Sequence, residues 1–341
     1  MLLSVLDQTP IPEGATGAQA LRNTIDLARL ADELGYHRYW VSEHHGGAML
    51  AGPSPEVLIG PIASATEHIR VGSGGVMLPH YSPLKVAESF TILAGLFPGR
   101  VDLGIGRAAG TDPLTTFALQ RDRRQAAPDD FPQQLAELLA YFEDDLPEDH
   151  PFRHLATALP GLPELPVPWL LGSSEQSAVW AGNLGLPYSF ADFINSDGAR
   201  LVKVYRERFE AARELRAPRT SVAATVICAP SDDEARYLAT SSRMAFALLR
   251  RGTLIAIPTP ERAEAFLASD PRAGNRVSPR RAIVGSPATV RAGIEELASE
   301  YQADEVIAVT IVHDHAARRR SYELLADAMG LQPRSLAAAT A

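Results

Sequence analysis

The sequence predicts an α/β protein built as a single (β/α)8 TIM barrel with extended crossovers after the fourth and seventh strands. Three observations predict this fold class: short apolar runs alternate with stretches of helical periodicity, eight strand and helix units follow one another, and no Gly/Ser-rich linker separates them. Parallel strands joined by helices close into a barrel of about 250 residues, which insertions enlarge. The 341 residues therefore fit one domain, 1–341.

Predicted strands and helices alternate regularly in the first half of the chain. The first apolar run is closed by Asp7 and Gln8, and the helix after it has apolar residues three and four positions apart and a stop at Gly35. The third strand carries an unusual Gly72-Ser-Gly-Gly75 core, which lets another surface approach its backbone. The expected strands are 2–6, the first half of 38–46, 69–77 and 101–105, and the expected helices are 18–34, 55–67 and 83–97.

The second half repeats the pattern with two long insertions. Acidic and proline-rich stretches fill 111–166, where 130–142 is the one convincing helix, and an irregular Arg- and Pro-rich segment, 251–285, follows the seventh strand. We expect the latter to form a mobile lid; a passive surface insertion is the alternative. The Ala-rich tail, 335–341, is expected to fray. The expected strands are 167–171, 187–191, 221–229 and 305–311, and the expected helices are 175–184, 198–215, 232–250, 287–301 and 316–329.

Charge, composition and cysteine usage exclude several classes of function. The net charge is −9 and the pI is about 5.5, which opposes the phosphate backbone of nucleic acids. Cys228 is the one cysteine, so no intramolecular disulfide forms, and no pattern of histidine, cysteine or acidic residues indicates a metal site. The amino-terminal sequence does not read as a signal peptide, and no apolar stretch approaches the roughly 20 residues of a membrane span. We expect a cytoplasmic protein without a nucleic-acid or membrane partner.

The stretch Arg38-Tyr-Trp-Val-Ser-Glu-His-His-Gly46 carries the first candidate for catalysis. It places Glu43, His44 and His45 beyond the carboxyl end of a buried strand, which is where parallel barrels do chemistry. Two imidazoles beside a carboxylate supply proton donors and acceptors near neutral pH. The competing interpretation is a strand end with exposed polar residues, and the stretch alone does not decide between them.

Two further candidates follow the fourth and fifth strands. Arg107 can reach into the barrel mouth as a phosphate clamp, or lie on the surface and pair with Asp112. The segment Gly172-Ser-Ser-Glu-Gln-Ser177 stands where the fifth strand turns into its helix, and its amides and hydroxyls can bind an anion. The alternative is a capping box between Ser173 and Gln176, which needs no ligand. Together the two candidates suggest a bound phosphate monoester.

Five motifs stand in one order along the chain. They are Trp40-Val-Ser-Glu-His-His45, Val71-Gly-Ser-Gly-Gly-Val-Met-Leu-Pro79, Gly99-Arg-Val-Asp-Leu-Gly-Ile-Gly-Arg107, Gly172-Ser-Ser-Glu-Gln-Ser177 and Ala303-Asp-Glu305. With them the sequence resembles the bacterial luciferase-like flavin-dependent monooxygenases over nearly its whole length, from Leu2 to about Met329. Each motif is weak by itself, and the resemblance rests on their joint order.

The resemblance implies a barrel that binds reduced FMN in its mouth. Gly74-Gly75 matches the family's non-prolyl cis peptide beside the flavin ring, and His44 matches the catalytic histidine, with His45 or Glu43 assisting it. The resemblance also implies two sets of contact residues. The flavin phosphate would be held by Arg107, Ser173, Ser174 and Ser177, and the pocket would be lined by Leu6, Asp7 and Gln8.

A two-component monooxygenase is the function that the resemblance implies. A separate flavin reductase supplies reduced FMN, and the enzyme uses dioxygen to oxygenate a small organic substrate; a homodimer is expected as in many relatives. Gly106 stands where luciferase has a reactive cysteine, so light emission is not expected. The alternatives are an oxidoreductase using the deazaflavin F420, which the short serine loop and the Glu-His-His motif disfavour, a non-catalytic flavin-binding protein, and an aldolase-like barrel without redox chemistry.

Overall fold

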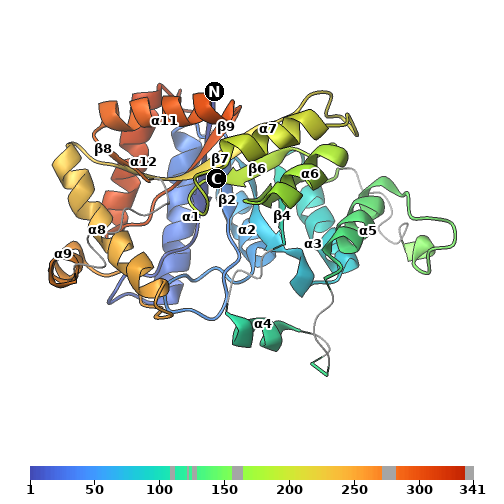
Figure 1. The fold of residues 1–341 in the computed structure, drawn as a ribbon, viewed down its shortest axis with the longest axis horizontal. Helices are drawn as coiled ribbons and strands as arrows, with labels where there is room; N and C mark the ends of the chain where they lie inside the picture. Colours follow the sequence, from blue (N-terminus) through green and yellow to red (C-terminus); the bar gives the residue numbers. More distant parts are fainter. Residues whose placement is uncertain (108–111, 121–122, 125–128, 156–163, 271–281, 335–341) are drawn as a thin grey trace, which may run out of the picture.

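Eight parallel strands form a closed barrel in the computed structural model, which describes residues 1–107, 112–120, 123–124, 129–155, 164–270 and 282–334 (Figure 1). Strands β1 to β6 pair in sequence order, β6 pairs with β7, β7 with β9, and β9 with β1. The predicted barrel is thereby confirmed. The strands are β1 (Leu2–Asp7), β2 (Arg38–Val41), β3 (Arg70–Met77), β4 (Val101–Gly106), β5 (Val167–Gly172), β6 (Tyr188–Ala191), β7 (Thr220–Cys228) and β9 (Glu305–Val309).

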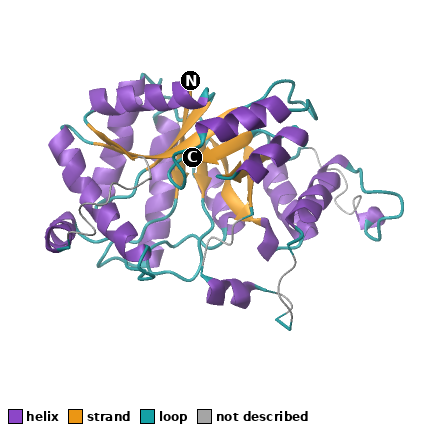
Figure 2. Cartoon of the chain, in the orientation of Figure 1, coloured by secondary structure: helices purple, strands orange, loops and turns teal. Residues whose placement is uncertain are grey.

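Helices lie around the strands (Figure 2). The first begins where Thr16 accepts a hydrogen bond from the amide of Gln19 at 3.2 Å, and Gly35 follows its end with φ +85°. Within the described residues, no helix is long and apolar enough to cross a membrane. The helices are α1 (Gly17–Glu33), α2 (Pro55–Ser64), α3 (Pro83–Leu96), α4 (Pro113–Leu119), α5 (Phe131–Glu143), α6 (Glu175–Asn183), α7 (Ala199–Arg208), α8 (Asp232–Leu249), α9 (Pro260–Ser269), α11 (Pro287–Tyr301) and α12 (His315–Met329), with 3₁₀ turns η1 (Leu78–His80) and η2 (Arg153–Leu155).

The segment 251–285 is more regular than the sequence predicts. It contains α9 and a further strand, β8 (Ala282–Gly285), which pairs with β7 from Thr225 to Cys228, outside the closed ring. The expectation of an irregular segment is therefore wrong: an Arg- and Pro-rich composition does not exclude short regular elements. Residues 271–281 lie outside the described part of the chain.

The described part of this segment is tied to the loop after β1. The amide of Ile257 donates to the carbonyl of Ile11 at 2.8 Å, the amide of Glu13 donates back to the carbonyl of Ile257 at 2.8 Å, and Arg262 pairs with Glu13. A lid movement of the whole segment would have to break these contacts.

Helix α7 ends at Arg208, earlier than the predicted end at Leu215. Phe209 is already extended, and the amide of Glu210 donates to the carbonyl of Gly182 at 3.0 Å. The chain leaves the helix to bind the end of α6, which is a tertiary contact that local propensity does not report.

A buried ion network closes the amino-terminal end of the barrel. Arg38, at the start of β2, pairs with Asp102 of β4 and with Glu305 of β9, both at 2.6 Å, and all three side chains are buried. The guanidinium also lies over the ring of Trp169, 4.6 Å from its centroid. Since polar side chains fill this end, the carboxyl-terminal end, which we call the mouth, is the end left for a ligand.

Above this network the barrel interior is apolar. Trp40 and Trp169 meet edge to face with centroids 5.4 Å apart. Met49, from the loop after β2, and Ile257 pack onto the same cluster, so two loops cover part of the mouth. The buried members of the cluster are Leu6, Trp40, Met49, Trp169, Ala223, Ala245, Ile257, Ile307, Val309 and Ile311.

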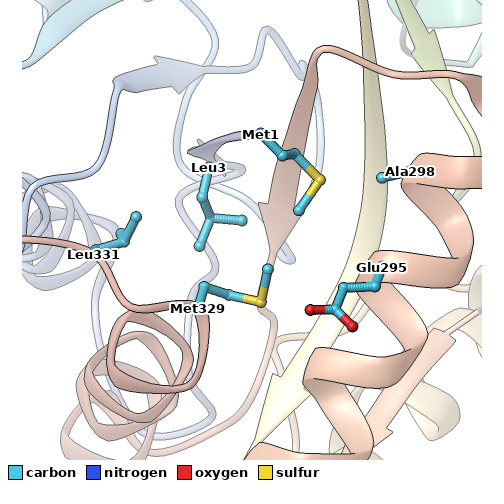
Figure 3. A pocket seen from close by; sticks show the side chains of 6 residues that line it. All are labelled: Met1, Leu3, Glu295, Ala298, Met329 and Leu331. Carbon is cyan, nitrogen blue, oxygen red and sulfur yellow. The ribbon is translucent and has the colours of Figure 1, made fainter.

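A cavity of about 310 Å³ opens beside the start of β1 (Figure 3). It lies between β1, α11 and the end of α12, and its lining residues are Met1, Leu3, Glu295, Ala298, Met329 and Leu331. Because it belongs to the amino-terminal end of β1, it is not part of a site at the mouth.

Candidate active site

The loop that follows β2, residues 42–53, is here called the histidine loop. Its Glu43 is fully buried, and one carboxylate oxygen lies 2.7 Å from Nε2 of His45 while the other accepts a hydrogen bond from the amide of Met77 at 2.8 Å. The carboxylate thereby orients the imidazole and joins the loop to the end of β3. A carboxylate that holds a histidine ring in this way supports proton transfer by the imidazole.

Several titratable side chains lie around Glu43, on the side of the mouth formed by β2 and β3. The ring of His80 meets that of His45 edge to face at 5.9 Å. Burial, followed by the charge of Glu43, raises the pKa of Tyr81, and burial also raises the pKa of Glu56. The sequence did not indicate His80, Tyr81 or Glu56, although the first two stand three and four positions after the Gly-rich third strand.

His44 is held through its backbone. Its amide donates to the carbonyl of Gly52 at 3.0 Å, across the base of the histidine loop, and its side chain is half-buried. Beyond it, a Cβ added at Gly46 would lie 2.6 Å from Oγ1 of Thr115 in α4. The loop is therefore packed against a neighbouring element as well as closed on itself.

The glycine-rich third strand contains a cis peptide bond between Gly74 and Gly75, as the resemblance implied. The pairing of β3 with β4 shifts its register between Gly74 and Val76. A Cβ at Gly74 would meet Leu6 at 2.5 Å, and a Cβ at Gly75 would meet the carbonyl oxygen of Gly104 at 2.8 Å. The strand can therefore approach its neighbours this closely only without side chains at these positions.

We expect the substitution Gly75→Ala to lower the free energy of unfolding by about 1–3 kcal/mol, because the new methyl group must displace the backbone of β4. Urea denaturation measures the effect. Gly95→Ala in α3 is the matched control: a Cβ there meets nothing within 4 Å, and alanine favours the helix. Equal stability of the two variants would contradict the close approach at Gly75.

Arg107 follows β4 and lies beside α6. Its guanidinium contacts both carboxylate oxygens of Asp129, at 2.8 and 3.0 Å, and stands 5.6 Å from the ring centroid of Trp180 in α6. Asp112, the partner named in the surface alternative, instead caps α4 by accepting hydrogen bonds from the amides of Leu114 and Thr115. About half of the Arg107 side chain is exposed, so it remains accessible to an anion.

The serine turn, residues 172–177, caps α6. A capping box is present, as in the alternative interpretation, but it joins Ser174 and Ser177, one position later than the pair of Ser173 and Gln176 named there. The hydroxyl of Ser177 is buried and lies 2.9 Å from that of Tyr188, so it is occupied within the protein. Ser173 is half-buried and Ser174 exposed, and these two are the serines open to a ligand.

Asn195 supports the serine turn from the next loop. Its amide nitrogen donates to the carbonyl of Ser173 at 3.1 Å. Sequence reasoning missed this residue, although a polar side chain shortly after β6 is the signal that drew attention to the other strand ends. Arg107, beside α6, and the turn that begins α6 are thus brought to one side of the mouth, and Glu43, His44 and His45 to another.

Asp7 does not line the mouth, contrary to expectation. Its buried carboxylate accepts hydrogen bonds from Thr24 of α1 at 2.7 Å and from Arg318 of α12 at 2.6 Å, so it faces the helices rather than the barrel interior. Burial alone would raise the pKa of Asp7, but the charge and hydrogen bonds of Arg318 outweigh it and hold that pKa below its ordinary value. Among the described residues, no group of three or more histidine, cysteine or acidic side chains has the geometry to hold a metal ion.

A closed parallel barrel with a carboxylate–histidine pair and an arginine beside α6 at its mouth defines an enzyme-like β/α barrel. The family model described as luciferase-like monooxygenase matches residues 1–303. The chain therefore belongs to the luciferase-like monooxygenase family, which confirms the resemblance and supports an oxidoreductase.

Relatives match along nearly the full length of the chain. A luciferase-like monooxygenase of Escherichia coli (strain K12) is 40% identical over 326 residues, covering 95% of this chain and 96% of the relative. The N-acetyl-S-alkylcysteine monooxygenase of Bacillus subtilis (strain 168) is 37% identical over 329 residues, covering 96% and 98%. The crystal structure of apo-MsnO8 is 42% identical, with a TM-score of 0.89 over 98% of this chain and 99% of that one.

More distant structures share the fold and differ in cofactor. The oxygenating constituent of 3,6-diketocamphane monooxygenase from Pseudomonas putida, solved in complex with FMN, is 23% identical with a TM-score of 0.71, covering 96% and 97%. An F420-dependent secondary alcohol dehydrogenase is 13% identical with a TM-score of 0.60, covering 95% and 98%. At these identities the likeness shows the fold alone.

Proposed function

We propose that this chain is the oxygenase of a two-component system, which uses reduced FMN from a separate flavin reductase and dioxygen to insert one oxygen atom into a small organic substrate. The observation that carries the proposal is the hydrogen bond between the Glu43 carboxylate and the imidazole of His45, together with the hydrogen bond that the same carboxylate accepts from the amide of Met77. These bonds hold the imidazole of His45, and with it the histidine loop, beside the strand that contains Gly74 and Gly75.

The residues at the mouth fit FMN. A phosphate monoester requires a cation and hydrogen-bond donors, and Arg107 with the hydroxyls of Ser173 and Ser174 at the start of α6 supplies both. The ring would lie against the Gly74 and Gly75 peptide of β3. Binding of the phosphate would replace Asp129 as the partner of Arg107.

Reduced FMN, when bound, supplies the electrons that activate dioxygen. The protein would position the flavin, exclude water from the mouth and transfer protons. His44 donates or accepts the proton at its imidazole, Glu43 keeps the neighbouring ring of His45 oriented, and the apolar cluster below the mouth excludes water. Thioethers of the N-acetyl-S-alkylcysteine type are suitable first substrate probes, because the relative from Bacillus subtilis is named for them.

Anaerobic titration with reduced FMN and with reduced F420 tests the choice of cofactor. We expect tighter binding of FMN, because the serine turn is short and begins a helix that can hold a terminal phosphate. Tighter binding of F420 would favour the deazaflavin oxidoreductase instead. Oxygen uptake above the rate of free reduced flavin separates an enzyme from a non-catalytic flavin-binding protein, and the buried Glu43 with its histidine partner favours the enzyme.

We propose that two copies associate through α2 and α3. These helices contact each other and expose Val57, Ile92 and Leu96 by 70%, 58% and 66%, and apolar side chains exposed on neighbouring helices favour association. Leu96→Glu is expected to convert the dimer to a monomer in sedimentation velocity, because a buried unpaired charge opposes association. Leu114→Glu, an exposed leucine on α4, is the control that should leave the dimer intact. A monomeric parent protein would contradict the proposal.

A further inference from the structure

The buried ion pair of Asp7 and Arg318 joins β1 to α12 behind the mouth. Nη2 of Arg318 lies 2.6 Å from Oδ1 of Asp7, and Nε of the same guanidinium donates to the carbonyl of Thr310 at 2.9 Å. Thr24 and Tyr39 donate to the other oxygen of Asp7 at 2.7 and 2.5 Å. Every donor comes from a different element, so the carboxylate is fixed from several sides.

Asp7 also fixes the backbone of Thr9. The amide of Thr9 donates to Oδ1 of Asp7 at 2.6 Å, and Thr9 has φ +50°. A β-branched residue rarely adopts this conformation, and it persists only where the surroundings hold it. The bond from the Thr9 amide to the anchored carboxylate is such a constraint.

Thr9 in turn holds the base of the histidine loop. The carbonyl of Thr9 accepts a hydrogen bond from the amide of Ala51 at 2.9 Å. The carbonyl of Gly52, the residue after Ala51, accepts a hydrogen bond from the amide of His44 at 3.0 Å. A Cβ at Gly52 would lie 3.2 Å from Oγ1 of Thr9 and equally close to the carbonyl of Ser42, so the loop packs against Thr9 with no room between. A continuous series of contacts thus leads from α12 to the backbone of His44.

From this series we infer that Asp7 and Arg318 are positioning residues, which set the place of the His44 imidazole in the mouth through Thr9 and Gly52. The inference rests on the proposed function of His44. It gives Asp7 a role in the reaction without contact to flavin or substrate. It also explains why a buried carboxylate stands at the end of a strand whose interior face carries Leu6.

A second buried pair provides a matched control. Glu305 is as buried as Asp7, also has an arginine partner at 2.6 Å, and accepts a hydroxyl hydrogen bond from Ser4 at 2.5 Å. It lies at the start of β9, at the amino-terminal end of the barrel. Asp7→Asn and Glu305→Gln therefore make the same chemical change at opposite ends of the molecule.

The experiment compares these two variants in the full-length protein. Selective ¹³C labelling of histidine gives the ring signals, and His44→Ala identifies those of His44. We expect Asp7→Asn to shift the His44 ring signals and their titration midpoint, and to lower product formed per dioxygen consumed at least tenfold with reduced-FMN affinity changed less than twofold. Glu305→Gln should lower the unfolding temperature while leaving the His44 signals and the product yield at the wild-type values.

A double-mutant cycle separates positioning from general destabilisation. In a His44→Ala background, Asp7→Asn should cause no further loss of product yield. If Asp7→Asn does not fold, Thr24→Val removes one donor to the same carboxylate without changing charge, and a smaller shift of the His44 signals is expected.

Unchanged His44 signals in the folded Asp7→Asn protein, or in Thr24→Val where that variant replaces it, would overturn the inference, as would equal effects of Asp7→Asn and Glu305→Gln. Failure of the proposed function has a different signature. In that case His44→Ala leaves the product yield unchanged, while the ring signals still report whether Asp7 positions the loop.

Discussion

His44→Ala is expected to retain binding of reduced FMN and to lower the yield of oxygenated product by roughly 10²- to 10⁴-fold, the range for loss of a proton-transfer group. The phosphate would still be held by Arg107 and Ser174, and one face of the ring by the strand at Gly75, so the substitution removes only the contact of the ring with the imidazole. Anaerobic titration measures the affinity. Product and hydrogen peroxide per dioxygen consumed, with N-acetyl-S-alkylcysteine probes, measure the coupling.

The control for this experiment is His68→Ala. His68 is partly exposed and pairs with Glu67 just before β3, at the amino-terminal end of the barrel, so its loss should alter neither affinity nor yield. A wild-type product yield from the His44→Ala protein would show that His44 takes no part in the reaction. Loss of flavin affinity in that variant would instead give the imidazole a binding role.

Arg38→Met is expected to lower the free energy of unfolding by about 3–5 kcal/mol, the effect of removing one partner from a buried ion pair. The substitution leaves the buried carboxylate of Glu305 without its cation and that of Asp102 with Arg70 alone. Urea denaturation at neutral pH measures the loss. Arg236→Met, an exposed arginine on α8, should change stability by less than about 0.5 kcal/mol.

The same network sets a pH dependence. Burial would raise the pKa of Asp102, but Arg38 and then Arg70 outweigh it and lower that pKa below its ordinary value. Because the folded-state pKa is the lower one, the stability that Asp102 contributes is fully present above about pH 4, the unfolded value, and is lost as the pH falls through the folded value. Arg38→Met should raise the folded pKa and move acid unfolding to higher pH. An unchanged acid midpoint in Arg38→Met would contradict this account of the network.

The barrel strands could be predicted from sequence because each is a compact apolar run between polar or glycine residues, a pattern that parallel, fully covered strands impose. The missing strand, β8, lies in an Arg- and Pro-rich stretch and pairs only beyond the closed ring, so it stands outside the alternation of strands and helices by which the other strands were predicted. The end of α7 was missed for another reason. The amide of Glu210 there donates a hydrogen bond to α6, and the local sequence gives no sign of such a tertiary contact.

Many residues of the candidate site could be predicted from the sequence, but the hydrogen bonds between them could not. Glu43, His45 and Met77 are bonded as a group only because β2 and β3 are neighbours in the barrel. The position of Asp7 could have been read from the sequence. Successive strand residues point to opposite faces, so an inward Leu6 requires an outward Asp7. The partner Arg318, 311 positions away, carries no local signal.

A crystal structure of the complex with FMN tests the central claim most directly. We predict the flavin phosphate within hydrogen-bond distance of Arg107 and Ser174, and the ring between the Gly74 and Gly75 peptide and the imidazole of His44. A mouth that stays without flavin at saturating FMN, or a phosphate bound away from Arg107 and the start of α6, would contradict the account.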